Sequence, residues 1–197
     1  ELAEDCSQED YLAALEDLNK DETVHGILCF RPLPAHIDEE IVKYYIDDKK
    51  DVDCFSPLSL AKIMSGDKRG FAPCTPMGVI EILKYYDIDL RGKNVTVLGR
   101  SMVVGKPLSM LLLNRDSTVT ICHSKSKDLE NIVKGSDILV SCMGRAKSVD
   151  KSYIKEGAVV IDVGINFDQE GKMCGDVDTD DVLERVSHIT PVPGGVG

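Results

Sequence analysis

The most constraining feature of this sequence is a regular alternation of short apolar segments and helix-periodic segments between residues 94 and 164. Apolar runs of this length, separated by segments with hydrophobic residues at helical spacing, predict alternating strands and helices. We expect strands at 94–99, 117–123, 137–144 and 157–164, and helices at 105–115 and 127–135. We also expect each strand to be apolar on both faces, as in a parallel sheet that helices cover on both sides. The pattern predicts a doubly wound α/β fold with a parallel sheet of the Rossmann type.

The first part of the chain follows a similar alternation less regularly, which indicates part of a second α/β unit with a parallel sheet. We expect helices at 8–19, 37–46 and 75–87, and a short buried strand at 26–30. Thr75 is suited to the N-cap and Pro76 to the first turn of the third helix. We place the boundary between the units at the start of this helix, so that they span residues 1–74 and 75–197.

Composition and charge exclude several classes of function. The chain has 197 residues, 43% of them hydrophobic, and a net charge of −11. Such a chain can bury a sizeable core, but it lacks the basic excess with which proteins bind nucleic acids or membrane surfaces. We therefore expect no nucleic-acid partner and no membrane partner. No apolar run approaches the roughly 18 residues of a membrane-spanning helix.

The seven cysteines show no C-x-x-C spacing. We therefore expect no metal site, and scattered cysteines without a disulfide framework favour a cytoplasmic location. The chain begins at Glu1 and ends at Gly197, within a glycine-rich turn. We expect it to be a piece of a longer polypeptide.

The stretch GRSMVVGKP, residues 99–107, lies between an expected strand and an expected helix, and three interpretations compete for it. A Walker A loop is disfavoured, because five residues separate Gly99 from Gly105 and Pro107 stands where that loop needs Ser or Thr. A dinucleotide loop would place its glycines and the helix N-terminus against a pyrophosphate, although the spacing is not G-x-G-x-x-G. A plain turn would use the glycines only for backbone angles. The flanking strand and helix and the second strand–helix unit favour the dinucleotide loop.

The end of the next expected strand bears on the choice of cofactor. Sites for NAD carry an acid about 20 residues after the glycines, which binds the ribose 2′-hydroxyl. Here the strand ends in His123, Ser124, Lys125 and Ser126 without a carboxylate, and Arg100 lies in the glycine loop. Hydroxyl groups and cations are suited to a 2′-phosphate, so the sequence favours NADP. The alternative is that Lys125 belongs to an ordinary solvated turn.

Eight segments together resemble one family. They are GILCFRPLPAHID, KDVDCF, PCTPMGVIEIL, GRSMVVGKP, TICHSK, VVIDVGIN, GDVD and TPVPGGVG. In this order and spacing they resemble the bifunctional methylenetetrahydrofolate dehydrogenase/methenyltetrahydrofolate cyclohydrolase family, over residues 24 to 197. The resemblance implies an NADP-binding Rossmann domain at 75–197 and part of a folate-binding catalytic domain at 1–74, with a folate cleft between them. It implies oxidation of 5,10-methylenetetrahydrofolate by NADP, then hydrolysis of the methenyl product to 10-formyltetrahydrofolate, in a homodimer that serves one-carbon metabolism.

The resemblance also implies roles for individual residues. On the cofactor side these are Gly99, Arg100, Ser101, Gly105, Ser124, Lys125 and Ile165. On the folate side, Asp53 binds the pterin, and Pro193 and Gly194 line the folate site. A carboxylate at Asp53 can accept paired N–H bonds from an aminopyrimidine edge. Without the resemblance, Asp53 is an ordinary turn residue in an acidic stretch.

Three positions depart from the family pattern. The catalytic lysine of the family lies in a Tyr-x-x-x-Lys motif upstream of the GIL segment, and nothing before Gly26 fits it. Tyr45 and Lys49 have that spacing, but they follow the segment and are interpreted as coincidence. Phe30 stands where the family often has a glutamine that supports the lysine, and Cys54 replaces the usual glycine of D-V-D-G. The catalytic residue is therefore expected upstream of this chain.

Two other functions remain open from the residues themselves. One is a Rossmann-type dinucleotide-binding or regulatory module without catalysis of its own. The other is a different NADP-dependent α/β oxidoreductase, for example of the amino-acid dehydrogenase type.

Overall fold

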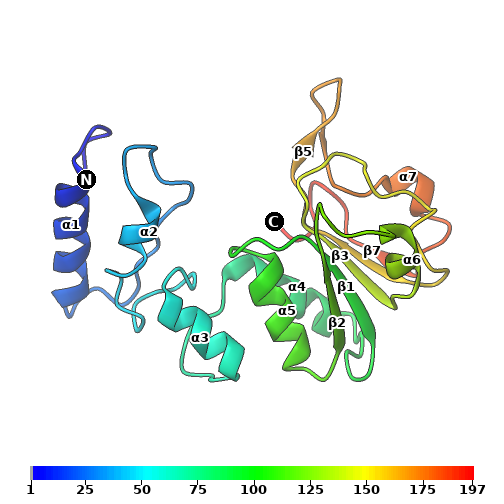
Figure 1. Cartoon of the computed structure of the whole chain (residues 1–197), viewed down its shortest axis with the longest axis horizontal. Coiled ribbons are helices and arrows are strands. Elements are labelled where there is room, and N and C mark those ends of the chain that lie inside the picture. The colour runs from blue at the N-terminus through cyan, green and yellow to red at the C-terminus, as the bar shows by residue number, and fades with distance from the viewer. Residues whose placement is uncertain (1) are drawn as a thin grey trace. The chain divides into compact units, whose positions relative to one another are not determined.

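The computed structural model describes residues 2–197 (Figure 1). The chain forms two compact units, Glu1–Cys74 and Thr75–Gly197. Among the described helices, none is both long and apolar enough to cross a lipid bilayer.

The second unit contains a five-stranded sheet with the strand order β2-β1-β3-β4-β7, in which every pair is parallel. Its strands are β1 Asn94–Leu98, β2 Thr118–Cys122, β3 Ile138–Ser141, β4 Val159–Asp162 and β7 His188–Ile189. The chain runs outward from β1 to β2 and then returns to β3 on the other side of β1. This reversal of strand order creates the crevice at the carboxyl ends where doubly wound sheets bind ligands.

Helices cover both faces of this sheet, as the sequence predicts. They are α4 Cys74–Tyr85, α5 Gly105–Leu113, α6 Leu129–Lys134 and α7 Thr179–Val182. Figure 1 shows α4 and α5 on one side and α6 and α7 on the other. On the second side, Leu98, Leu139 and Val160 of the sheet pack with Val133 of α6 and Val182 of α7 in one buried cluster. The α/β class and the parallel sheet are confirmed.

Three details of this unit differ from expectation. Of the five residues of β2, Cys122 alone is buried, because β2 is an edge strand and pairs only with β1. The helix α4 already includes Thr75, which is therefore not its N-cap. A two-stranded hairpin, β5 Asn166–Phe167 and β6 Met173–Cys174, projects from the unit (Figure 1). Strands of two residues are too short to give a periodic signal in the sequence.

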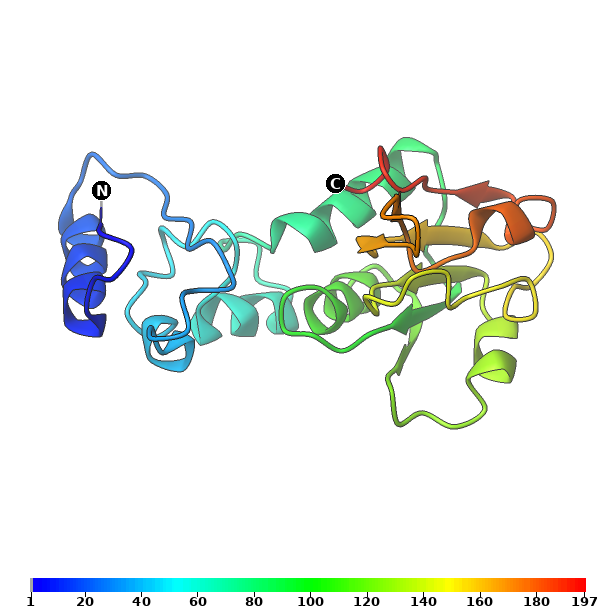
Figure 2. The ribbon, with the colours of Figure 1, turned by 90° about the horizontal axis from the view of Figure 1, so that it is seen from above.

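The first unit consists of helices joined by long irregular segments (Figure 2). Its helices are α1 Gln8–Lys20, α2 Glu39–Val42 and α3 Pro57–Ser65. They begin at side-chain caps: the Ser7 hydroxyl accepts a bond from Asp10 N, and the Ser56 hydroxyl accepts one from Ser59 N. One buried cluster forms the core, and its members are Leu15, Ile27, Cys29, Ile37, Val42, Ile46 and Phe55.

The expected buried strand at 26–30 is reduced to one parallel bridge between Ile27 and Asp51. Ile27 and Cys29 are buried, whereas Leu28 and Phe30 are 45% and 81% exposed. The segment therefore carries apolar residues on its exposed face as well as on its buried face. A continuous apolar sequence of this kind is the pattern expected of a strand buried on both faces. The expected helix at 37–46 is likewise confined to α2. Within the described residues, this unit forms no continuous sheet.

Candidate functional site

A cavity of about 360 Å³ lies at the carboxyl ends of β1, β2 and β3, where the strand order reverses. Its lining comes from the loops that follow these three strands and from the start of α6. The lining residues are Leu98, Gly99, Arg100, Ser101, His123, Ser124, Ser126, Leu129, Cys142, Met143 and Arg145. This volume is typical of a small-molecule site. We call this space the β1–β3 cavity.

The two glycines of the loop between β1 and α5 are required by close backbone packing. Gly99 has a φ of +131°, and a side chain there would lie 2.6 Å from the carbonyl oxygen of Cys142. A side chain at Gly105 would lie 2.3 Å from the carbonyl oxygen of Gly99. Gly105 is buried beneath the loop and is not among the residues that line the cavity. Packing alone therefore explains both glycines, and only Gly99 also faces the cavity.

Ser101 closes the same loop at the start of α5. Its hydroxyl oxygen accepts hydrogen bonds from Val104 N at 3.1 Å and from Gly105 N at 3.4 Å. The hydroxyl therefore satisfies N–H groups that would otherwise be unpaired at the helix start. Its own proton remains available as a donor toward the cavity.

The lining of the β1–β3 cavity contains two arginines, one histidine and three serines but no carboxylate. This is unusual in a chain with 34 acidic and 23 basic residues. Arg100 is exposed and forms no ion pair within residues 2–197. Such a donor set fits a phosphate, whose oxygens accept charge-assisted bonds from arginine and hydroxyl groups. The residues present therefore fit the phosphorylated ribose of NADP.

The turn after β2 contains two of the expected site residues, and only one of them lines the cavity. Ser124 lines the cavity, whereas Lys125 does not. The backbone N–H of Lys125 donates to His123 Nδ1 at 3.1 Å, and its side chain is exposed. His123 thus holds the turn through one ring nitrogen while its ring faces the cavity.

A second cavity of about 480 Å³ brings together Ile165, Pro193 and Gly194, three of the expected site residues. Thr75 and Val104 also line it, together with the segment that follows β4. Gly194 has a φ of +96°, a conformation that favours glycine. The side chain of Ile165 is 66% exposed and offers an apolar surface at this cavity.

Two buried aspartates hold the loops of both cavities. Asp162 Oδ1 accepts bonds from Gly164 N at 2.9 Å and from Asp176 N at 3.0 Å. Asp176 Oδ2 accepts from Met143 N at 2.7 Å, and its Oδ1 accepts from Arg145 N at 2.8 Å. Burial raises the pKa of Asp162, and the backbone N–H donors oppose this effect. The two aspartates therefore hold the backbone segments that follow β3 and β4 in fixed positions relative to each other.

The loop at 51–56 in the first unit gives its two aspartates different environments. Asp51 is buried, and its two oxygens accept from Phe55 N at 2.9 Å and Ser56 N at 2.8 Å. Asp53 is partly exposed, and its Oδ1 accepts from Cys74 N at 3.0 Å. Asp51 is therefore the structural residue of the loop, and Asp53 is available to contact a ligand.

Arg31 lies against Asp53. Its Nη2 atom is 3.5 Å from Asp53 Oδ2 and its Nε atom is 3.9 Å from Glu39 Oε1. Its guanidinium carbon also lies 4.7 Å from the centre of the Phe55 ring, within the range of a cation–π contact. Arg31 therefore fixes the orientation of Asp53 from the side opposite Cys74.

Cys54 adopts a φ of +56°, the left-handed conformation that a glycine would adopt readily. The side chain is buried, and burial raises the pKa of the thiol to about 12. The thiol is therefore protonated at neutral pH.

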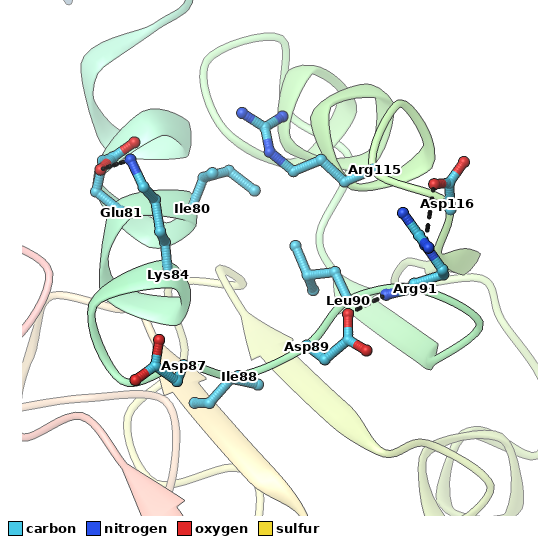
Figure 3. A pocket seen from close by; sticks show the side chains of 10 residues that line it. All are labelled: Ile80, Glu81, Lys84, Asp87, Ile88, Asp89, Leu90, Arg91, Arg115 and Asp116. Carbon is cyan, nitrogen blue, oxygen red and sulfur yellow. Dashed lines mark hydrogen bonds and ion pairs between the residues drawn. The ribbon is translucent and has the colours of Figure 1, made fainter.

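A larger cavity, of about 660 Å³, lies near the amino ends of the strands in the second unit (Figure 3). Its three cations already have partners. Lys84 Nζ lies 3.4 Å from Glu81, Arg91 Nε lies 3.7 Å from Asp116, and Arg115 donates to Leu111 O at 2.9 Å. This internal compensation distinguishes it from the β1–β3 cavity, where the arginines lack such partners.

Sequence reasoning missed Arg145, Met143 and Leu129 in the β1–β3 cavity and Arg31 beside Asp53. A signal for Arg145 exists, because it follows the expected strand 137–144. Because the carboxyl ends of parallel strands meet at one edge, a residue after the third strand is expected to lie near those after the first two. No local pattern marks Arg31, whose contacts are with residues distant in the sequence.

Comparisons with known proteins agree with this geometry. Residues 73–197 match the family described as "Tetrahydrofolate dehydrogenase/cyclohydrolase, NAD(P)-binding domain", and residues 1–53 match the corresponding catalytic domain. The "Bifunctional protein FolD" of Clostridioides difficile (strain 630) is 64% identical over the whole chain, which covers 69% of that relative. The FolD protein of Clostridium kluyveri is 58% identical, with the same coverage.

Solved structures of related enzymes share the fold. The bifunctional FolD enzyme of Campylobacter jejuni has a TM-score of 0.97 and 44% identity, covering 100% of this chain and 70% of its own. The Trypanosoma brucei enzyme, described as complexed with NADP cofactor and inhibitor, has a TM-score of 0.90 and 38% identity, covering 99% and 69%. The chain belongs to the tetrahydrofolate dehydrogenase/cyclohydrolase family.

Proposed function

We propose that this chain is the greater part of a bifunctional enzyme that oxidises 5,10-methylenetetrahydrofolate with NADP and hydrolyses the methenyl product to 10-formyltetrahydrofolate. Membership of the family over both domains supports the folate chemistry. The observation that carries the cofactor assignment is the β1–β3 cavity, which is lined by arginine and serine without a carboxylate. NADP, when bound, supplies the acceptor for the hydride that leaves the folate methylene carbon.

The residues of this chain bind and orient the reactants. Arg100 and Ser124 are proposed to hold the phosphorylated ribose, with Gly99 and Ser101 shaping the loop beneath it and Lys125 adding charge at the rim. Gly105 is proposed to bring the start of α5 to the cofactor, as helix N-termini do with phosphates. Ile165, Pro193 and Gly194 are proposed to line the reacting end of the site, and their shared cavity supports this. Transfer of a hydride depends chiefly on such positioning.

Asp53 is proposed to anchor the pterin. Its carboxylate can accept paired N–H bonds from the aminopyrimidine edge. The bond from Cys74 N and the contact with Arg31 support this role, because they limit the rotation of the carboxylate. We assign residues 1–74 to the folate-binding catalytic domain and residues 75–197 to the NADP-binding domain.

Phe30 supports a second candidate function, in which the enzyme is a dehydrogenase whose cyclohydrolase activity is weak. Its exposed phenyl ring cannot supply the hydrogen bond of the glutamine found at this position in the family. We further propose a homodimer in the cytoplasm that serves one-carbon metabolism, with a product of the kind that purine biosynthesis consumes. The seven free cysteines are compatible with a reducing compartment.

An assay of the full-length protein for both half-reactions tests the proposal. NADPH formation with 5,10-methylenetetrahydrofolate measures the first step, and loss of added methenyltetrahydrofolate measures the second. We expect NADPH formation with NADP and a slower second step. Absence of NADPH formation in a folded protein would contradict the dehydrogenase assignment.

A further inference from the structure

Arg145 shares the β1–β3 cavity with Arg100 and Ser124, although it comes from a different loop. The loop that follows β3 is anchored from below, because Asp176 accepts bonds from the backbone N–H groups of Met143 and Arg145 at 2.7 and 2.8 Å. Gly144, between them, has a φ of +67° and forms the turn. The backbone of Arg145 is therefore held in place while its side chain remains exposed.

The charges around Arg145 are unbalanced without a ligand. No carboxylate lines the cavity, and Arg145 forms no ion pair with any residue from 2 to 197. Two of the other four arginines in the second unit, Arg91 and Arg115, have a carboxylate or carbonyl partner. Two guanidinium groups beside one cavity repel each other, and an anion between them would remove that repulsion. An anionic group bound in this cavity would be attracted by both arginines.

We propose that Arg145 is a second cation for the 2′-phosphate of NADP and helps the enzyme to discriminate NADP from NAD. This inference rests on the proposed function. Ser124, at the end of β2, marks the position where the ribose hydroxyl is expected, and Arg145 lines the same cavity. The pyrophosphate is expected at the start of α5, but Gly105 there is not part of this lining. Because Ser124 and Arg145 line the same cavity, the 2′-phosphate is the anion assigned to Arg145.

The chemistry of the three side chains suits this assignment. A phosphate monoester carries close to two negative charges and offers three acceptor oxygens. Arg100, Arg145 and Ser124 provide two cations and one hydroxyl from three separate loops. Leu129 and Met143 add apolar surface in the same lining, on which an adenine ring can pack. Arg145 is therefore a specificity-determining residue that acts by contact with the ligand.

The test measures dissociation constants for NADP and NAD in the full-length protein by titration calorimetry. Arg145→Ala should weaken NADP binding by about tenfold and NAD binding by less than about twofold. Arg145→Lys should restore part of the loss, because it keeps the charge without the planar fork. Lys147→Ala is the matched control. Lys147 is an exposed cation two residues from Arg145, and its side chain does not line the cavity. This substitution should change neither constant by more than about twofold.

Two probes locate the contact. Adenosine 2′,5′-bisphosphate should lose affinity for Arg145→Ala as NADP does, whereas adenosine 5′-phosphate should not. Equal losses for NADP and NAD, or a loss no larger than that of Lys147→Ala, would overturn the role of Arg145. If Arg100→Ala still weakened NADP binding in that case, the proposed function would stand. A folded wild-type protein that bound neither NADP nor the bisphosphate would overturn both proposals.

Discussion

Asp53 in the first unit and Arg100 in the second are both assigned to ligand binding, but their surroundings differ. The carboxylate of Asp53 already has partners, with Cys74 N at 3.0 Å on one oxygen and Arg31 at 3.5 Å from the other. Arg100 lies in a cavity without carboxylates and forms no ion pair within the part of the chain that the structure describes. The proposed folate anchor is therefore pre-oriented, whereas the proposed cofactor cavity would gain its counter-charge only when the ligand binds.

This difference predicts different consequences of substitution. Removing a partnered group disturbs the neighbours that it leaves unpaired, so it affects the local structure as well as binding. Removing an unpaired exposed cation affects affinity with little effect on stability. The following substitutions test the contrast, beginning with the largest expected effect.

Asp53→Ala should lower kcat/KM for the folate by at least about 100-fold while leaving NADP affinity intact. Two charge-assisted hydrogen bonds to one carboxylate are lost together, and the pterin donors remain unpaired. Steady-state kinetics and cofactor titration measure the two effects. Asp53→Asn serves as the control, because it retains an acceptor for Cys74 N but loses the charge beside Arg31. Unchanged folate kinetics in Asp53→Ala would make Asp53 an ordinary turn residue.

Arg100→Ala should weaken NADP binding by about tenfold or more and NAD binding by clearly less. The melting temperature should stay close to that of the wild type, because Arg100 is exposed and without an ion-pair partner among residues 2–197. Arg91→Ala is a suitable control, since Arg91 is an exposed cation that is paired with Asp116. Equal losses for the two cofactors would show that Arg100 does not contact the 2′-phosphate.

Phe30→Gln should raise the cyclohydrolase rate by about tenfold and leave the dehydrogenase rate nearly unchanged. An amide can donate and accept the hydrogen bond that orients the catalytic lysine of the family, whereas a phenyl ring cannot. Leu28→Gln is the control. It introduces the same amide at another exposed apolar position of the segment and should leave the cyclohydrolase rate unchanged. A wild-type protein that hydrolyses the methenyl compound as fast as it forms it would refute this prediction.

Cys54→Gly should change the free energy of unfolding by less than about 1 kcal/mol, because relief of the positive φ offsets the loss of a small buried side chain. Cys54→Val should destabilise by more than about 2 kcal/mol, because a β-branched residue is strained at this φ. Urea unfolding of both variants measures the difference. Similar stabilities for the valine variant and the wild type would show that the loop beside Asp53 can relax.

The regular part of the fold was predictable because its signals are local. The strands and helices between 94 and 164 each carry their own periodicity, and their alternation implies a parallel sheet. The segment at 26–30 was misjudged, because an apolar run reveals neither its pairing partner nor which of its faces is covered. Leu28 and Phe30 proved to be exposed, and one bridge to Asp51 is all the pairing that the described residues provide.

For the candidate site, the sequence by itself determined the residue types at the strand ends: the glycines after β1, Ser124 after β2, and the absence of an acid there. Only the tertiary structure decided which of them share a cavity, adding Arg145 and leaving Lys125 and Gly105 outside the lining. It also decided that Asp51 is buried while Asp53 is accessible beside Arg31. The physical reason is that strand ends and loops distant in sequence meet through packing and long-range hydrogen bonds, such as those of Asp176, which no local pattern encodes.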